Sequence, residues 1–79
     1  MNRYNIKVLI PILNKRYELF IPNNILIGNI LYMLVNSIKD MNGINLEKAR
    51  LYDSSNGEML DLDSYVYKYI NNGSELILI

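Results

Sequence analysis

The sequence predicts an α+β fold, in which a mixed sheet of four to five strands carries one main helix on one face and a short helical turn precedes the last strand. Three patterns lead to this prediction. Residues near both ends alternate in the manner of strands. The middle of the chain has apolar residues at steps of three and four, as in an amphipathic helix. Two Asn-Gly pairs mark tight turns in the last third.

An opening hairpin is expected from residues 4–13 and 17–21, which both alternate between two faces. One face of the first strand carries Ile6, Val8, Ile10 and Ile12. The turn between the strands is placed at residues 13–16. Pro11 has no N–H, so we expect it at a bulge or where its nitrogen faces away from a partner strand.

The predicted helix follows a break at residues 22–24 and runs for about four turns. Asn24 is the expected cap at its start, and Gly43 is expected to close its end in the left-handed conformation. The apolar stripe that this helix buries consists of Ile27, Ile30, Leu31, Leu34, Val35, Ile38 and Met41.

The last third is predicted to add a strand at residues 49–52, a fourth at 58–60 and a last strand at 74–79. A helical turn is expected to end near Tyr69, although the alternating tyrosines before it also fit a strand. For this order of elements the known solution is the β-grasp, with the first and last strands parallel at the sheet centre. The residues expected to face inward are Ile6, Val8, Ile10, Leu19, Ile21, Ile30, Leu34, Ile38, Leu51, Leu76 and Leu78.

The composition points to one compact domain, residues 1–79, without catalytic machinery. Apolar residues make up 51% of the chain and charged residues 20%, which is sufficient for a dense core. Cys and His are absent, which removes thiolate metal sites and the commonest general base. The carboxylates of Asp61 and Asp63 suit a helix cap, and nearby serines have no base to activate them. We therefore expect no enzyme activity, metal or cofactor.

Charge and hydropathy exclude two further classes of function. Eight basic and eight acidic residues balance, and no basic stripe indicates nucleic-acid binding. No apolar run is long enough for a membrane span, and the start lacks the features of a signal peptide. We expect a cytoplasmic location, either free or peripheral to a membrane complex.

Two segments carry a resemblance to a known family. Residues 17–22 read Tyr-Glu-Leu-Phe-Ile-Pro, and residues 27–38 begin a helix with an apolar–x–x–Ile pattern. From Ile6 to Ile79 the order and spacing of elements resemble ubiquitin-like β-grasp domains. Within them, the two segments are similar to the YukD/EsaB group of bacterial type VII secretion systems. The resemblance implies an accessory or regulatory protein of such a system, whose partners are secretion-machine components. Because the chain stops at Ile79 without Gly-Gly, we expect it not to be conjugated to other proteins.

The candidate site is the sheet face opposite the helix. In ubiquitin-like proteins the equivalent strands carry an apolar patch that binds partners. Contiguous apolar patches on small domains usually mark interfaces, and a polar rim is typical. The apolar residues expected on this face are Leu9, Phe20, Tyr52, Ile77 and Ile79, with Arg50 and Glu75 as the rim. There are two alternatives to such a partner-binding role. The chain could form a symmetric homodimer through this face, or it could act as the effector subunit of an enzyme complex.

Overall fold

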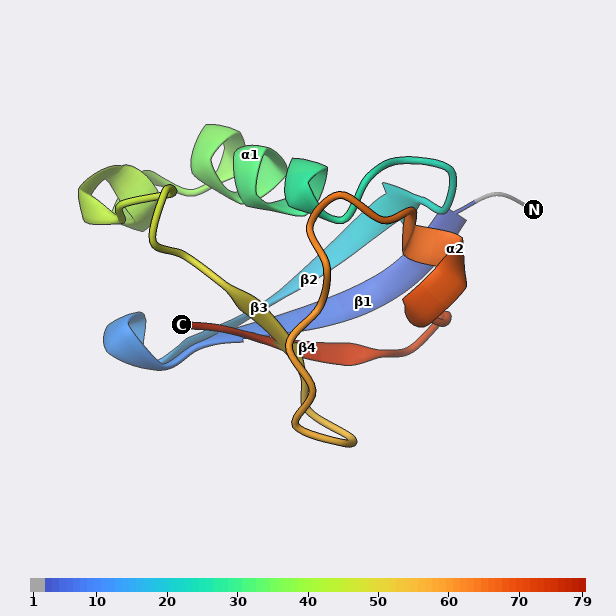
Figure 1. Cartoon of the computed structure of the whole chain (residues 1–79). Coiled ribbons are helices and arrows are strands. Elements are labelled where there is room, and N and C mark those ends of the chain that lie inside the picture. Colours follow the sequence, from blue (N-terminus) through green and yellow to red (C-terminus); the bar gives the residue numbers. More distant parts are fainter. Residues whose placement is uncertain (1–2) are drawn as a thin grey trace.

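The computed structural model describes residues 3–79, and for positions 40 and 42 it describes the backbone only. Four strands, two α-helices and two 3-10 helices follow one another along these residues (Figure 1). They are β1 (Arg3–Ile10), η1 (Pro11–Leu13), β2 (Lys15–Pro22), α1 (Gly28–Ser37), η2 (Lys39–Gly43), β3 (Leu51–Asp53), α2 (Val66–Tyr69) and β4 (Glu75–Leu78).

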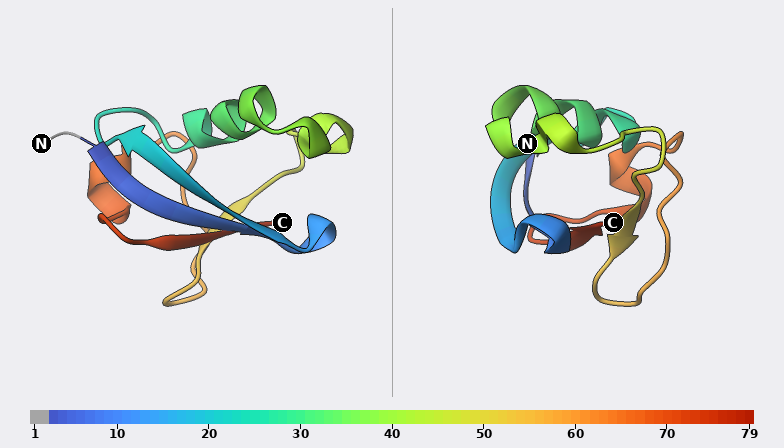
Figure 2. Two further views of the ribbon diagram at one scale, coloured as in Figure 1. Left: turned by 180° about the vertical axis from the view of Figure 1, so that it is seen from behind. Right: turned by 90° about the vertical axis from the view of Figure 1, so that its left-hand side faces the viewer.

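The sheet is mixed and has the strand order β2-β1-β4-β3. β1 and β2 form an antiparallel hairpin, β1 and β4 run parallel at the centre, and β3 pairs antiparallel with β4. α1 lies across one face of this sheet, and no helix formed by residues 3–79 lies on the opposite face (Figures 1 and 2). This arrangement confirms the predicted α+β fold, with the first and last strands parallel and adjacent.

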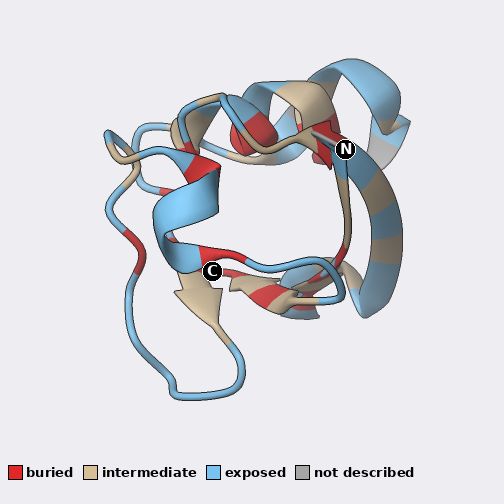
Figure 3. Cartoon of the chain, turned by 90° about the vertical axis from the view of Figure 1, so that its right-hand side faces the viewer, coloured by how far each residue is buried: buried red, intermediate tan, exposed pale blue. Residues whose placement is uncertain are grey.

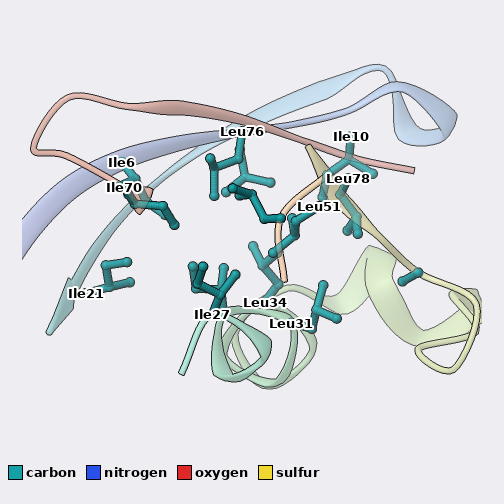
Figure 4. Close-up of a cluster of buried hydrophobic side chains, with 14 of the residues drawn as sticks. Ile6, Ile10, Ile21, Ile27, Leu31, Leu34, Leu51, Ile70, Leu76 and Leu78 are labelled. Carbon is teal, nitrogen blue, oxygen red and sulfur yellow. The ribbon is translucent and has the colours of Figure 1, made fainter. Parts of the chain in front are cut away.

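The core fills the space between the sheet and α1 (Figures 3 and 4). Alternate residues of the central strands point into it, because successive side chains of a strand face opposite sides. All the residues predicted to face inward are buried except Leu19 and Ile38, which are half-buried. Figure 4 shows Leu76 and Leu51 of the sheet pointing toward Leu34 of the helix.

The first hairpin turns earlier than predicted. β1 ends at Ile10, and Pro11 starts the 3-10 helix η1, because proline cannot donate to a sheet ladder and its φ suits a helical start. Asn14 then takes a left-handed φ of 52°, and its N–H donates to the carbonyl of Pro11 at 2.9 Å. Residues 15–16 therefore lie in β2 and not in the turn. Ile12, which the alternation grouped with Ile6, Val8 and Ile10, lies beyond the strand and is 79% exposed.

The helix α1 is shorter than the predicted four turns and is capped differently. It begins after Ile27, and no side-chain cap precedes it, so Asn24 is not the cap. Its first N–H groups are bound by a distant loop instead: Ile27 donates to the carbonyl of Ser64 at 2.8 Å. At the other end Ile38 takes an extended conformation, which stops α1 and divides the predicted helix into α1 and η2.

One prediction in the last third fails and one is confirmed. The predicted strand at 58–60 is reduced to one bridge between Tyr52 and Met59, so the sheet has four strands. The Asp53 N–H donates to the Glu58 carbonyl at 2.9 Å, but the chain leaves the sheet after Leu60, which is buried. The tyrosine-rich segment forms the one-turn helix α2, as the helical prediction required.

Alanine is expected to affect stability differently at Gly73 and at Gly43, two turn glycines that the sequence alone does not distinguish. Gly73 has a φ of +91°, a conformation that L side chains rarely adopt, whereas Gly43 is not in the left-handed region predicted for it. We expect Gly73→Ala to lower the free energy of unfolding by about 1–2 kcal/mol. Gly43→Ala is the control, because space around it is open, and should leave stability unchanged or slightly higher. Urea unfolding of both variants checks this; equal losses would contradict it.

Candidate protein-interaction face

A row of apolar side chains crosses the sheet on the face away from α1. The register places Leu9 beside Ile77, and Ile77 beside Tyr52. These three side chains point outward, because Val8, Ile10, Leu51, Leu76 and Leu78, which neighbour them along the strands, are buried. The bridge from Tyr52 to Met59 extends the row by one position, and Met59 is 59% exposed.

Ile79 extends this surface along the direction of β4. It lies two residues beyond Ile77 and is 71% exposed. Its N–H donates to the carbonyl of Arg50 at 2.9 Å, and the Arg50 N–H donates back at 2.8 Å. We call the surface formed by Leu9, Tyr52, Met59, Ile77 and Ile79 the outer patch.

Arg50 lies at the border of the outer patch with its guanidinium held in place. Its Nη1 donates to the carbonyls of Glu47 at 3.1 Å and Ala49 at 2.8 Å. A guanidinium fixed by its own backbone loses less freedom when it binds a partner. This position suits the predicted role as part of a polar rim.

A polar row borders the outer patch on its other side. Lys7 lies between Glu18 of β2 and Glu75 of β4. The Nε of Arg16 lies 3.2 Å from Oε2 of Glu75, so this ion pair reaches across β1. Arg16 sits in the same cross-strand row as Leu9 and Ile77, although the sequence prediction placed it in the turn.

Phe20 does not join the outer patch. It faces outward opposite Asn5 and is 65% exposed, but the row of Glu18, Lys7 and Glu75 separates it from Leu9. Alternation along a strand gives the face on which a side chain lies. The row in which it lies depends on register, which the sequence pattern does not fix.

Met59 is the residue of this surface that the sequence prediction missed. Leu60 is buried, which implies that the side chain of Met59, the preceding residue, faces outward. The turn after Asp53 brings the chain back beside β3, where Met59 pairs with Tyr52. This turn, residues 54–57, projects from the sheet on the side away from α1 (Figures 1 and 2). It forms a wall beside the Tyr52 end of the patch.

Comparisons with known proteins bear on the fold. No family model and no curated protein matches the sequence. Solved structures match over nearly the whole chain. A ubiquitin-like domain of Arabidopsis thaliana has a TM-score of 0.78 and 16% identity, covering 100% of this chain and 78% of that one. Ubiquitin of Caldiarchaeum subterraneum has a TM-score of 0.76 and 18% identity, covering 98% and 91%. The fold is ubiquitin-like.

A third structure with the ubiquitin-like fold was solved as a complex. It is the crystal structure of ATBAG1 in complex with HSP70, with a TM-score of 0.74 and 16% identity, covering 96% of this chain and 39% of that one. At these identities the three matches establish the shared fold and not a shared partner.

The ubiquitin-like fold here holds few other candidates for a site. Within residues 3–79, no helix is long and apolar enough to cross a membrane. No group of three or more potential metal ligands gathers among the described side chains. The rings of Tyr65 and Tyr67 stack at 5.6 Å beside α2, with Lys68 as the adjacent cation.

The ion pair on the outer face is expected to contribute little to stability. The side chains of Arg16 and Glu75 are 56% and 33% exposed, so water screens their attraction. Arg16→Ala should lower the free energy of unfolding by less than about 1 kcal/mol. Thermal unfolding at low and high salt measures this, and a larger, salt-independent loss would show that Arg16 acts through packing instead.

Proposed function

We propose that residues 1–79 form a single, non-enzymatic ubiquitin-like domain that binds a protein partner through the outer patch. One observation carries this proposal: Leu9, Ile77 and Tyr52 stand side by side on the sheet face that α1 does not cover. In sheets with one solvated face, outward positions are usually polar. Here adjacent strands place apolar side chains next to one another, which favours an interface over scattered exposure.

The border of the patch supports the same conclusion. Fixed or paired charges lie around it, namely Arg50 at one side and the Arg16–Glu75 pair at the other. An apolar centre with a polar rim is the usual anatomy of protein interfaces. The turn at residues 54–57 projects from the sheet beside Tyr52. This shape favours a partner whose contacting surface at Tyr52 is convex or extended.

The finer role that we propose is an accessory or regulatory component of a bacterial type VII secretion system, in the cytoplasm or at the periphery of its membrane complex. It rests on the resemblance of residues 17–22 and 27–38 to the YukD/EsaB group. That a structure with the same fold contains HSP70 supports the broader role in protein binding. The partners proposed are secretion-machine components.

A homodimer through the outer patch is the second candidate. Charges of both signs border the patch, with Arg50 at one side and the Arg16–Glu75 ion pair at the other. A two-fold axis through such a surface can bring opposite charges together around the apolar centre. Light scattering over a dilution series from millimolar to micromolar protein tests it; a monomer throughout excludes the homodimer.

Site-specific photo-crosslinking tests the proposed face directly. A benzoylphenylalanine at position 52 replaces one aromatic ring by another in the centre of the outer patch. The control carries the same group at position 67, where Tyr67 is exposed on α2. In the native host, covalent adducts are expected from position 52 and not from position 67. Adducts with the same protein from position 67 alone would contradict the proposal.

A further inference from the structure

The sheet has one long edge that no other strand of residues 3–79 covers. β2 is the outermost strand in the order β2-β1-β4-β3 and has 8 residues, whereas β3 at the opposite edge has 3. The bridge from Tyr52 to Met59 also covers part of the β3 edge. In the right-hand view of Figure 2, β2 forms one side of the domain. The open edge of β2 is therefore the place where a further strand can join the sheet.

The register of the hairpin identifies the backbone groups that point to this edge. The N–H of Lys7 donates to the carbonyl of Ser74 at 3.0 Å, so Lys7 directs its backbone groups toward β4 and not toward β2. Its partner on β2 is Glu18, which therefore directs its own N–H and C=O away from β1. The same holds for Arg16 and Phe20, two residues to either side, because the pattern repeats every two residues.

The charges along this edge complement those of a second copy. Arg16 and Glu18 are exposed, have opposite signs and lie two residues apart on the face away from α1. A second β2 that runs antiparallel and is centred on Tyr17 places Arg16 of each copy opposite Glu18 of the other. Pairing centred on Arg16 or on Glu18 places like charges opposite each other, which is unfavourable. The charge pattern therefore selects one register.

The backbone and the other face of β2 suit the same register. Arg16 and Glu18 both direct backbone groups to the edge, so two opposed residues can each donate to and accept from the other. Tyr17 is half-buried on the helix side and would meet Tyr17 of the second copy, and aromatic pairs across strands are favourable. β2 pairs with β1 without a bulge and has its proline at its last residue, so neither of these devices blocks residues 16–18.

Both charged side chains have atoms available for the new contact. The Nε of Arg16 lies 3.2 Å from Oε2 of Glu75, and the terminal guanidinium nitrogens have no partner among the described residues. Oε2 of Glu18 accepts from Nδ2 of Asn5 at 3.4 Å, which leaves Oε1. Because water screens the exposed pair of Arg16 and Glu75, its loss on dimerisation has little effect, and Lys7 remains beside Glu75.

We propose that the β2 edge binds the β2 edge of a second copy of this chain, in an antiparallel pairing centred on Tyr17. The two-fold axis closes the dimer, and the sheet continues from one copy into the other. Paired residues of neighbouring strands lie on the same face, so both α1 helices cover one face and both outer patches lie on the other. Such a dimer presents the outer patch twice to a partner that carries two matching sites.

Reversal of the two charges tests the pairing. Sedimentation equilibrium of the full chain should give a dimer with a Kd on the order of 100 µM, as expected for a small interface. Arg16→Glu alone and Glu18→Arg alone should each weaken the dimer at least about tenfold, because like charges then oppose each other. An equimolar mixture of the two variants should dimerise about as tightly as the unmodified chain, because opposite charges meet again between unlike copies. Circular dichroism checks that each variant is folded.

Control variants separate the β2 edge from net charge and from the outer patch. Lys68→Glu on α2 and Glu47→Arg before β3 change the net charge by the same amounts at exposed positions. Each should leave the dimer Kd within about twofold. Tyr52→Glu combined with Ile77→Lys should also leave it unchanged, because β1 separates these residues from β2.

Amide hydrogen exchange followed by NMR locates the interface. When the protein concentration rises from about 10 µM to about 1 mM, the N–H groups of Arg16 and Glu18 should exchange more slowly. Those of Tyr17 and Leu19 face β1 and should not change. A monomer at about 1 mM would overturn the proposal and leave the edge to an extended segment of another protein. A dimer that survives both charge reversals, no recovery in the mixture, or loss of the dimer in the outer-patch variant would also overturn it.

Discussion

Replacing Leu76 by alanine is expected to lower the free energy of unfolding by about 3–4 kcal/mol. Leu76 is fully buried in the central part of the sheet, where β4 lies between β1 and β3. Removal of its isobutyl group leaves a cavity that a strand paired on both sides cannot close by moving. At about 0.05–0.15 kcal/mol per residue, a domain of this size has a total stability of roughly 4–12 kcal/mol. The variant should therefore be only marginally folded.

Ile77→Ala is the matched control for this prediction. It is the next residue of the same strand, but it faces outward and is partly exposed. We expect a loss below about 1.5 kcal/mol, since less apolar surface leaves water at this position. Urea unfolding monitored by circular dichroism measures both variants. Similar losses at the two positions would mean that something other than α1 buries the outer face equally.

The core could be predicted from the sequence because its pattern follows from strand geometry. Val8 and Leu76 alternate with outward neighbours, and this alternation holds wherever one sheet face is covered. The order of elements then limited the topology to a β-grasp. Both inferences use information that is local or requires only the order of segments.

The predictions that failed depended on distant parts of the chain. The start of α1 is capped by the carbonyls of Leu62 and Ser64, more than thirty residues away, so a local search favoured Asn24 instead. The first strand was predicted to continue through Pro11 to Leu13 because alternation continues there, but the proline ends the strand at Ile10. Phe20 shares the face of the outer patch and not its row, which only the register reveals.

The largest functional effect is expected from Tyr52→Glu combined with Ile77→Lys, which should abolish partner capture while leaving the domain folded. The register places these two positions directly opposite each other on β3 and β4. Opposite charges at such a pair attract, whereas two aspartates would repel and destabilise the sheet. The new lysine side chain would also lie near Glu75, and the new glutamate near Arg50. The centre of the outer patch becomes charged, and a partner that buries it must desolvate both charges.

The control for this variant is Tyr67→Glu combined with Tyr69→Lys, which introduces the same charges on the exposed side of α2. Both variants should unfold at nearly the temperature of the unmodified chain. In capture from the native host followed by quantitative mass spectrometry, only the sheet-face variant should lose the partner, by more than about tenfold, because two central contacts worth 1–2 kcal/mol each are removed. Retained capture would place the partner on another surface of the domain. Loss in both variants would mean that the partner reads the overall charge pattern of the domain and not its outer patch.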